Sequence, residues 1–177
     1  MTFNSDDEKK AIESVYGNDP AHKIIELVPQ GQNGEWLKNA CASQVKCDVL
    51  VISGHFGGLF FGEKTLPTLS MTEMFQHSCQ NDCPNIFESV KSIYLMGCNT
   101  LATKKQDHRS IEDYLSVLVG DGFPLQNAEV VAASRYANFG ESIENQMRMI
   151  FPKAELIFGF DSTGPLGKKA GPLLKKA

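Results

Sequence analysis

Strand-length apolar runs alternate with segments of helical periodicity along the chain, and this alternation limits the folds open to it. The apolar runs with strand composition are residues 22–28, 48–54, 92–97, 129–134 and 155–160. The segments between them predict helices at 34–43, 70–80, 110–119 and 141–151. Strands and helices in alternation build parallel sheets with helical crossovers. The sequence therefore predicts an α/β fold: an open, mostly parallel β-sheet covered by helices on both faces.

The two most apolar runs predict the middle of this sheet. Residues 48–54 and 92–97 are apolar on both strand faces, which is typical of central strands in a parallel sheet. We expect these two strands side by side. Residues 129–134 and then 155–160 should extend the sheet on one side, and 22–28 should extend it on the other.

Two local signals refine the connections. Ser70 and Glu73 form a capping box, and Leu69 with Met74 fits the hydrophobic staple around it, so a helix is expected to begin at residue 70. Glycines and a proline surround an apolar pair within 57–67 and predict a small hairpin or an excursion of the chain.

Composition and charge restrict the classes of protein. The 177 residues suffice for one domain, assigned to 21–177, after a polar N-terminal arm or short helix at 1–20. A net charge of −4 argues against a nucleic-acid partner, and the apolar runs are too short to cross a membrane. The acidic first residues are unlike a secretory signal. The five cysteines have no repeated spacing, which predicts reduced thiols and a cytoplasmic location.

Two chemically reactive side chains follow the predicted central strands. His55 comes after 48–54 and Cys98 after 92–97, each directly after a glycine. Sites in such sheets lie beyond the carboxyl ends of the strands, and neighbouring strands are about 5 Å apart. A histidine at that distance can deprotonate a cysteine and stabilise the thiolate, which is the attacking form. The pair predicts a nucleophilic Cys98 with His55 as general base.

The stretch from "SGHFGGLFF" to "IYLMGCNT" resembles the core of the caspase-like cysteine peptidases, a group that includes caspases, metacaspases, separases, gingipains, clostripains and bacterial CHAT-domain proteases. The shared pattern is an apolar strand leading to the catalytic His, a small hairpin, a helix and a second apolar strand ending in the nucleophilic Cys. The likeness covers residues 22–160. It implies a caspase-like fold and a cysteine endopeptidase that acts on protein substrates without metal or cofactor. A regulatory partner or signal would control it, as in bacterial defence.

The resemblance also implies an oxyanion hole and a substrate pocket. Backbone N–H groups of Phe56, Gly57 and Cys98 would hold the oxyanion, with Phe56 standing where the family usually has glycine. Residues 129–134 look like the family's strand that leads into the pocket wall. The candidate pocket residues are Met96, Ser134, Arg135 and Asp161.

The pocket residues predict a preference for long apolar side chains. Met96 occupies the position of the glutamine with which caspases read aspartate, and it offers neither charge nor amide. Arg135 would repel a basic substrate residue. Asp161 reverses that expectation if it pairs with Arg135 or reaches the pocket itself.

Other interpretations remain beside the peptidase. A catalytically inactive caspase-like scaffold would keep the fold for binding alone. A flavodoxin-like domain would bind a phosphate or nucleotide at the strand ends, yet neither glycine-rich phosphate-loop motif is present. A metal site at His77, Cys79 and Cys83 lacks a second ligand pair, so no metal is expected. The charged residues 104–109 predict a solvated loop, with a self-cleavage loop as the alternative.

Overall fold

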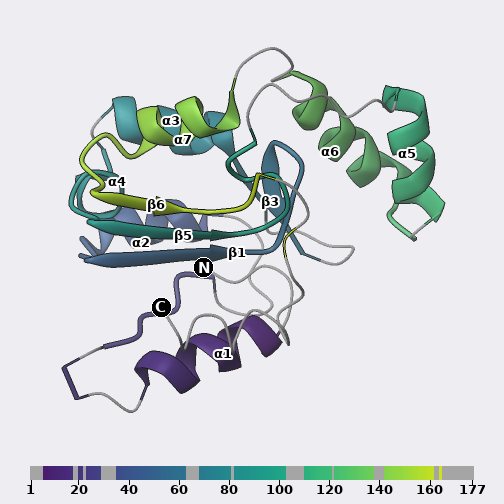
Figure 1. Cartoon of the computed structure of the whole chain (residues 1–177). Helices are drawn as coiled ribbons and strands as arrows, with labels where there is room; N and C mark the ends of the chain where they lie inside the picture. Colours follow the sequence, from purple (N-terminus) through teal and green to yellow (C-terminus); the bar gives the residue numbers. More distant parts are fainter. Residues whose placement is uncertain are drawn as a thin grey trace.

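The computed structural model describes residues 6–17, 20–21, 23–28, 35–62, 68–80, 82–102, 110–120, 122–137, 142–161 and 164. Over these ranges the fold is mixed α/β, with a three-stranded parallel sheet, a smaller antiparallel sheet and several helices (Figure 1). No helix within these ranges is both long and apolar enough to span a membrane. The loop expected at 104–109 lies outside the described residues.

The main sheet has the strand order β1-β5-β6, and all its strands are parallel. β1 (Val49–Ser53) pairs with β5 (Ser92–Met96), and β5 pairs with β6 (Leu156–Phe158). The predicted adjacency of the two most apolar strands is therefore confirmed, and β5 is central as expected. β1 is an edge strand of the described sheet, so its predicted place in the middle is wrong. The strand expected at 155–160 is also present, one place closer to β5 than predicted.

Residues 129–134 are helical, and their assignment to a strand is wrong. They belong to α6 (Leu125–Ala137), in which Ala128, Val131 and Ala132 are buried while Val130 is 57% exposed. Buried positions three and four residues apart follow the helical period, whereas a strand buries every second residue. Two adjacent valines resemble a strand in composition, but the surrounding alanines favour a helix.

Residues 22–28 are the second segment whose predicted strand is wrong. Residues 23–28 carry no regular secondary structure, and residue 22 lies outside the described ranges. Leu27 and Val28 are nevertheless buried in the main core. The neighbouring Glu26 accepts a hydrogen bond from Lys9 of α1 (Asp6–Tyr16) at 2.7 Å. The segment thus contacts α1 and the core without joining the ladder of the sheet.

The helices expected from apolar periodicity are present. They are α2 (Trp36–Ala42), α3 (Met71–Cys79), α5 (Ile111–Gly120) and α7 (Ile143–Ile150). The predicted N-cap is confirmed, because the Oγ of Ser70 accepts a hydrogen bond from the N–H of Glu73 at 3.0 Å and the two staple residues are fully buried. A short α4 (Pro84–Phe87) was not expected. Its proline lies in the first turn, where a helix needs no N–H donor.

Alternate residues of the central strands form the core. Leu50 and Ile52 of β1, with Ile93 and Leu95 of β5, are buried in one apolar cluster that includes side chains from α2, α3, α4 and α7. In Figure 1, α3 and α7 lie together beside the sheet, and α2 lies near β1 and β5. This packing holds β1 and β5 in place and thereby fixes the positions at which the two strands end.

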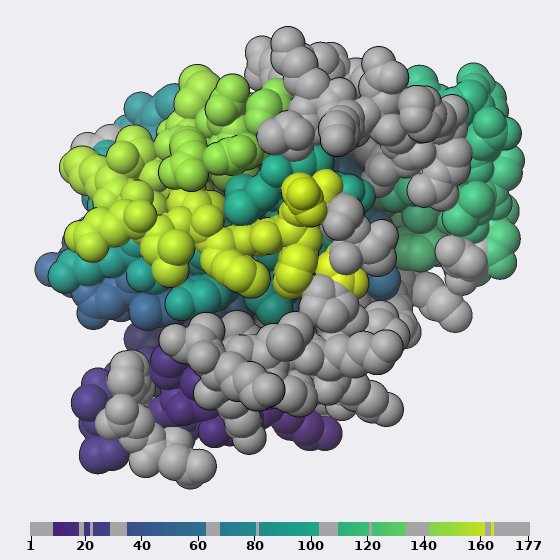
Figure 2. Space-filling model, viewed as in Figure 1, coloured from purple at the N-terminus to yellow at the C-terminus, as the bar shows by residue number. Residues whose placement is uncertain are grey.

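The other face of the sheet is more open than the two-sided covering that the sequence predicts. Val49, Leu156 and Phe158 are between 40% and 45% exposed, and β6 with the residues after it lies on the surface in yellow in Figure 2. α1 contacts this face, where Tyr16 forms a side-chain hydrogen bond with Tyr94. Burial, followed by the Tyr94 phenol, raises the pKa of Tyr16.

A small antiparallel sheet follows β1 directly. It contains β2 (His55–Phe56), β3 (Leu59–Phe61) and β4 (Thr68–Ser70), which confirms the hairpin expected within 57–67 as far as residue 62. A second apolar cluster joins β3 to α5 and α6, which stand to the side of the main sheet in Figure 1. Its buried residues are Leu59, Phe61, Tyr114, Leu118, Ala128, Val131 and Ala132.

Candidate active site

His55 and Cys98 occupy equivalent positions after two paired parallel strands. Ser53, the last residue of β1, is opposite Met96, the last residue of β5. His55 and Cys98 each follow two residues later. The N–H of Gly54, one residue past β1, donates to the carbonyl of Met96 at 3.3 Å. The hydrogen bonding between the two segments therefore continues one residue beyond β1. The parallel register therefore brings both side chains to the same edge of the sheet.

Gly97 lets the two strand exits approach each other closely. A Cβ at this position would lie 2.8 Å from the carbonyl oxygen of Gly54 and 3.0 Å from the Cβ of Phe56. Real Cβ atoms essentially never come within 3.0 Å of another heavy atom. The backbone before Cys98 is thus in contact with the backbone on both sides of His55, and a side chain at residue 97 would push them apart.

The loop that carries Cys98 is tied to the ends of β5 and β6 through the buried Thr100. Its Oγ1 donates toward the carbonyl of Leu95 at 3.1 Å and accepts from the N–H of Phe160 at 3.1 Å. The N–H of Leu101 donates to the carbonyl of Phe160 at 2.9 Å. Asn99 turns the chain with a φ of 59°, in the left-handed region that asparagine tolerates better than most residues. These contacts hold the half-buried Cys98 at a fixed place.

His55 begins β2 and is exposed. Its backbone pairs with Phe61 across the small hairpin, and the centroids of the two rings are 5.3 Å apart. Phe61 is itself buried against Phe123, with ring centroids 5.6 Å apart. The imidazole is therefore exposed and packs against the Phe61 ring.

The predicted oxyanion donors differ in their present partners. The N–H of Gly57 donates to the carbonyl of Leu59 at 3.1 Å, and Phe56 pairs with Phe60 in the hairpin. In the described part of the chain, the N–H of Cys98 donates to no backbone carbonyl. Of these two N–H groups, the Gly57 group is engaged in a backbone hydrogen bond and the Cys98 group is not, among the described residues.

Two of the four predicted pocket residues follow strands of the sheet and two do not. Met96 ends β5 and is half-buried, and Asp161 is exposed three residues after β6. Ser134 and Arg135 lie in α6, so the argument that a neighbouring strand brings them to the site is wrong. The substrate preference drawn from Met96 and Asp161 stays a prediction.

Sequence reasoning missed two groups beside the site. The Oγ of Ser53 is fully buried and has no hydrogen-bond partner among the described residues. The backbone N–H of Gly164 donates to the Sγ of Cys98 at 3.4 Å. A serine at the end of an apolar strand is a weak signal, and the contact of Gly164 is a backbone contact with no signature in the sequence.

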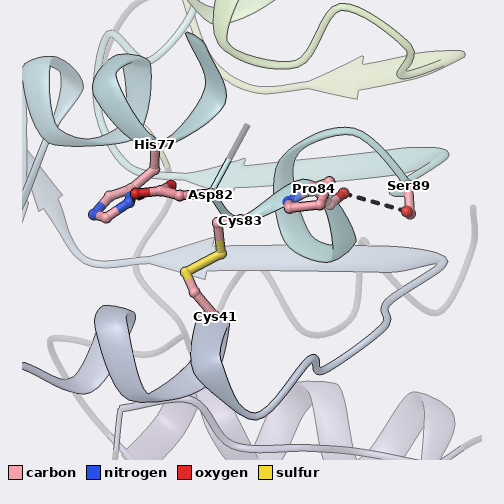
Figure 3. The surroundings of a disulfide bond; sticks show 6 residues. All are labelled: Cys41, His77, Asp82, Cys83, Pro84 and Ser89. Atoms are coloured by element: carbon pink, nitrogen blue, oxygen red, sulfur yellow. Dashed lines mark hydrogen bonds and ion pairs between the residues drawn. A yellow bond between two sulfur atoms is a disulfide. The ribbon is translucent and has the colours of Figure 1, made fainter. Parts of the chain in front are cut away.

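Two of the cysteines form a disulfide, which corrects the expectation of five reduced thiols. Cys41 in α2 is bonded to Cys83, which directly precedes α4 (Figure 3). Disulfides are uncommon in a reducing cytoplasm, so the reduced-thiol argument for a cytoplasmic location no longer holds for this pair. The free cysteines are Cys47, Cys79 and Cys98.

His77 of α3 and Asp82, which lies between α3 and α4, form a hydrogen-bonded pair. The Nδ1 of His77 lies 2.7 Å from the Oδ1 of Asp82, and Figure 3 shows the two side chains pointing at each other next to the disulfide. Cys83 is not a free ligand, because its sulfur is bonded to Cys41. Across the described ranges, no group of three or more His, Cys, Asp or Glu residues is arranged to hold a metal ion.

A cavity of about 400 Å³ lies away from these residues. Its walls are α1, Ala21, residues 23–27 and the segment from Lys46 to Val51, so it adjoins the start and middle of β1. A flavodoxin-like domain would instead bind its ligand at the carboxyl ends of the strands. The position of the cavity therefore gives no support to that alternative.

No family model matches the chain, and neither a curated protein nor a solved structure matches it significantly. The structure supports the α/β architecture and the parallel pairing of β1 with β5. The caspase-like resemblance rests on the residues and their order along the chain.

Proposed function

We propose that the chain is a caspase-like cysteine endopeptidase in which Cys98 is the nucleophile and His55 the general base. The observation that carries this proposal is the equal offset of the two residues from the Ser53–Met96 pair. A nucleophile and its base must be within reach of each other, and adjacent parallel strands that end in register meet that need with a backbone separation of about 5 Å.

Each step of the proposed reaction uses a group at this edge of the sheet. His55 takes the proton of the thiol, and the Cys98 sulfur attacks the carbonyl carbon of the substrate peptide bond. The N–H of Cys98 donates to the resulting oxyanion. His55 then returns the proton to the leaving amine as the C–N bond breaks, which leaves a thioester on Cys98. Water activated by His55 hydrolyses the thioester and restores the thiol.

The substrate of the proposed enzyme is a protein, and control by a regulatory protein partner or signal is part of the proposal. The exposed position of His55 and the half-buried position of Cys98 are compatible with an extended substrate backbone lying across the strand exits.

The test is a search for new protein N-termini after incubation of a mixed proteome with the protein. Cys98→Ala and His55→Ala should each lower cleavage by a factor of about 10³ or more, and the double variant should lose little beyond either single variant, because the two groups act as a unit. Cys79→Ala removes an exposed free thiol from α3 and serves as the matched control, with cleavage unchanged.

Cleavage that persists in Cys98→Ala would overturn the proposal. If the wild-type protein reacts with a thiol label at Cys98 and yet cuts no protein, the inactive-scaffold alternative takes its place. Both results are read from the same samples by mass spectrometry.

A further inference from the structure

A backbone donor outside the proposed dyad contacts the candidate nucleophile. The N–H of Gly164 donates to the Sγ of Cys98 at 3.4 Å, a normal length for a hydrogen bond to sulfur. Gly164 follows β6, and 66 residues separate it from Cys98. The contact is therefore formed by tertiary structure.

The surroundings of Gly164 explain how its backbone reaches the sulfur. A Cβ at residue 164 would lie 3.0 Å from the Phe160 ring and 3.5 Å from the carbonyl carbon of Gly97. Both backbone groups of Phe160 are hydrogen-bonded to the loop that carries Cys98. The Phe160 N–H donates to Thr100, and the Phe160 carbonyl accepts from Leu101. The segment after β6 is thus anchored to the loop that carries the nucleophile.

We propose that the Gly164 N–H is a positioning and thiolate-stabilising donor for Cys98. This inference rests on the proposed function, because it gives a role to a second donor at the same sulfur. A thiolate accepts a hydrogen bond more strongly than a thiol does, since the charge assists the bond. A donor aimed at the sulfur therefore favours the reactive form and holds the sulfur in one orientation for attack.

A covering role for the same segment predicts the opposite effect. If residues near Gly164 only shielded the sulfur, removing the contact would expose Cys98 and speed its reaction with a small reagent. If the N–H stabilises the thiolate, removing it slows that reaction. The sign of the change in reactivity separates the two roles.

The experiment measures alkylation of Cys98 by iodoacetamide in the whole chain, read by mass spectrometry across a range of pH. Gly164→Pro removes the N–H. Gly164→Ala keeps it, and its methyl group meets mainly the Phe160 ring, which can turn aside. We expect Gly164→Pro to slow alkylation at neutral pH about tenfold, the scale of one charge-assisted hydrogen bond, and to move the midpoint of the pH profile upward. Gly164→Ala, which keeps the N–H donor, should be alkylated faster than Gly164→Pro.

The wild type and the two Gly164 variants have the same titratable groups around the loop that carries Cys98. His55 lies on the adjacent strand exit, and Asp161 follows β6. Glu144, at the start of α7, is paired with Arg148 at 3.2 Å. Cys79 is exposed and free, so its alkylation in the same samples is an internal reference that should not change.

Alkylation that is unchanged or faster in Gly164→Pro overturns the proposal. If that variant does not fold, the amide resonance of Gly164 in the ¹⁵N-labelled wild type decides instead. Its chemical shift should change with pH as Cys98 ionises, and this change should be absent in Cys98→Ala. A Gly164 amide shift that has the same pH dependence in both proteins refutes the role. Neither readout needs a substrate, so a protein that cuts nothing would end the proposed peptidase function while leaving this inference to be judged separately.

Discussion

Replacing Gly97 with alanine should damage the candidate site more than the stability of the fold. The new Cβ would lie 2.8 Å from the Gly54 carbonyl oxygen and 3.0 Å from the Phe56 Cβ. Neither atom can rotate away, because one belongs to the backbone and the other is fixed to it. Ordinary contact begins at 3.4 Å, so the two strand exits must separate by about half an ångström to relieve the overlap.

The magnitude follows from that displacement. Overpacking of this kind costs about 1–3 kcal/mol of unfolding free energy, which a protein of this size survives. A displacement approaching 1 Å between catalytic groups can cost a factor of about 100 in rate. We therefore expect Gly97→Ala to remain folded, with an unfolding free energy lower by about 1–3 kcal/mol, and to lose about 10- to 100-fold in cleavage rate.

Gly120→Ala is the matched control. Gly120 ends α5, and a Cβ there would meet no heavy atom within 4 Å. That variant should keep full activity and gain up to about 1 kcal/mol of stability from helix propensity. Urea unfolding and cleavage of the same proteome substrate are measured for both variants. If Gly97→Ala is as stable and as active as Gly120→Ala, the close contact between the strand exits is not what places His55 and Cys98.

Three further predictions concern the frame around the site. Reduction of the Cys41–Cys83 disulfide opens a link across 42 residues and should lower the unfolding free energy by up to about 4 kcal/mol on the chain-entropy account; a urea midpoint that ignores reductant would contradict this. Ser70→Ala removes the N-cap of α3 and should cost about 1 kcal/mol in the same assay. Burial, assisted by Asp48, raises the pKa of Cys47 above 9.0. The folded state therefore keeps that proton longer than the unfolded state, so stability present below pH 9 should decline above it, and Cys47→Ala should show less of this alkaline loss.

The parts of the fold that could be predicted from sequence are those with strong local signals. β1 and β5 follow from unbroken apolar runs, and α3 follows from the capping box at Ser70. The prediction that His55 and Cys98 lie at the same edge of the sheet also required the two strands to be parallel neighbours. General rules of sheet topology predicted this arrangement, and the observed pairing agrees with it.

The segment at 129–134 could not be assigned from composition, because tertiary packing decides its structure. Val130 and Val131 favour a strand, but only Val131 packs into the cluster with Ala128 and Ala132, while Val130 faces solvent. That cluster exists because α5 and β3 lie next to α6. The spacing of the buried residues is therefore set by partners distant in sequence, and the sequence near residue 130 alone does not determine it.

The disulfide could not be predicted either, because tertiary packing brings its two cysteines together. Cys41 is in α2 and Cys83 directly precedes α4, and an odd number of cysteines with irregular spacing predicted no disulfide pairing. Their sulfurs meet because α2 and α4 both pack into the main core, where Cys83 is buried. The same packing leaves Cys79, only four residues earlier, exposed and free.

Strand register is the feature on which the candidate site depends most. With Ser53 opposite Met96, His55 and Cys98 come to the same level beyond the sheet. A shift of one residue would move one of them by about 3.3 Å along the strand direction and would turn its side chain to the other face. The buried alternation of Leu50 and Ile52 against Ile93 and Leu95 forbids that shift, since it would expose all the core residues of one strand. The apolar core thus fixes the register of the two strands that His55 and Cys98 follow.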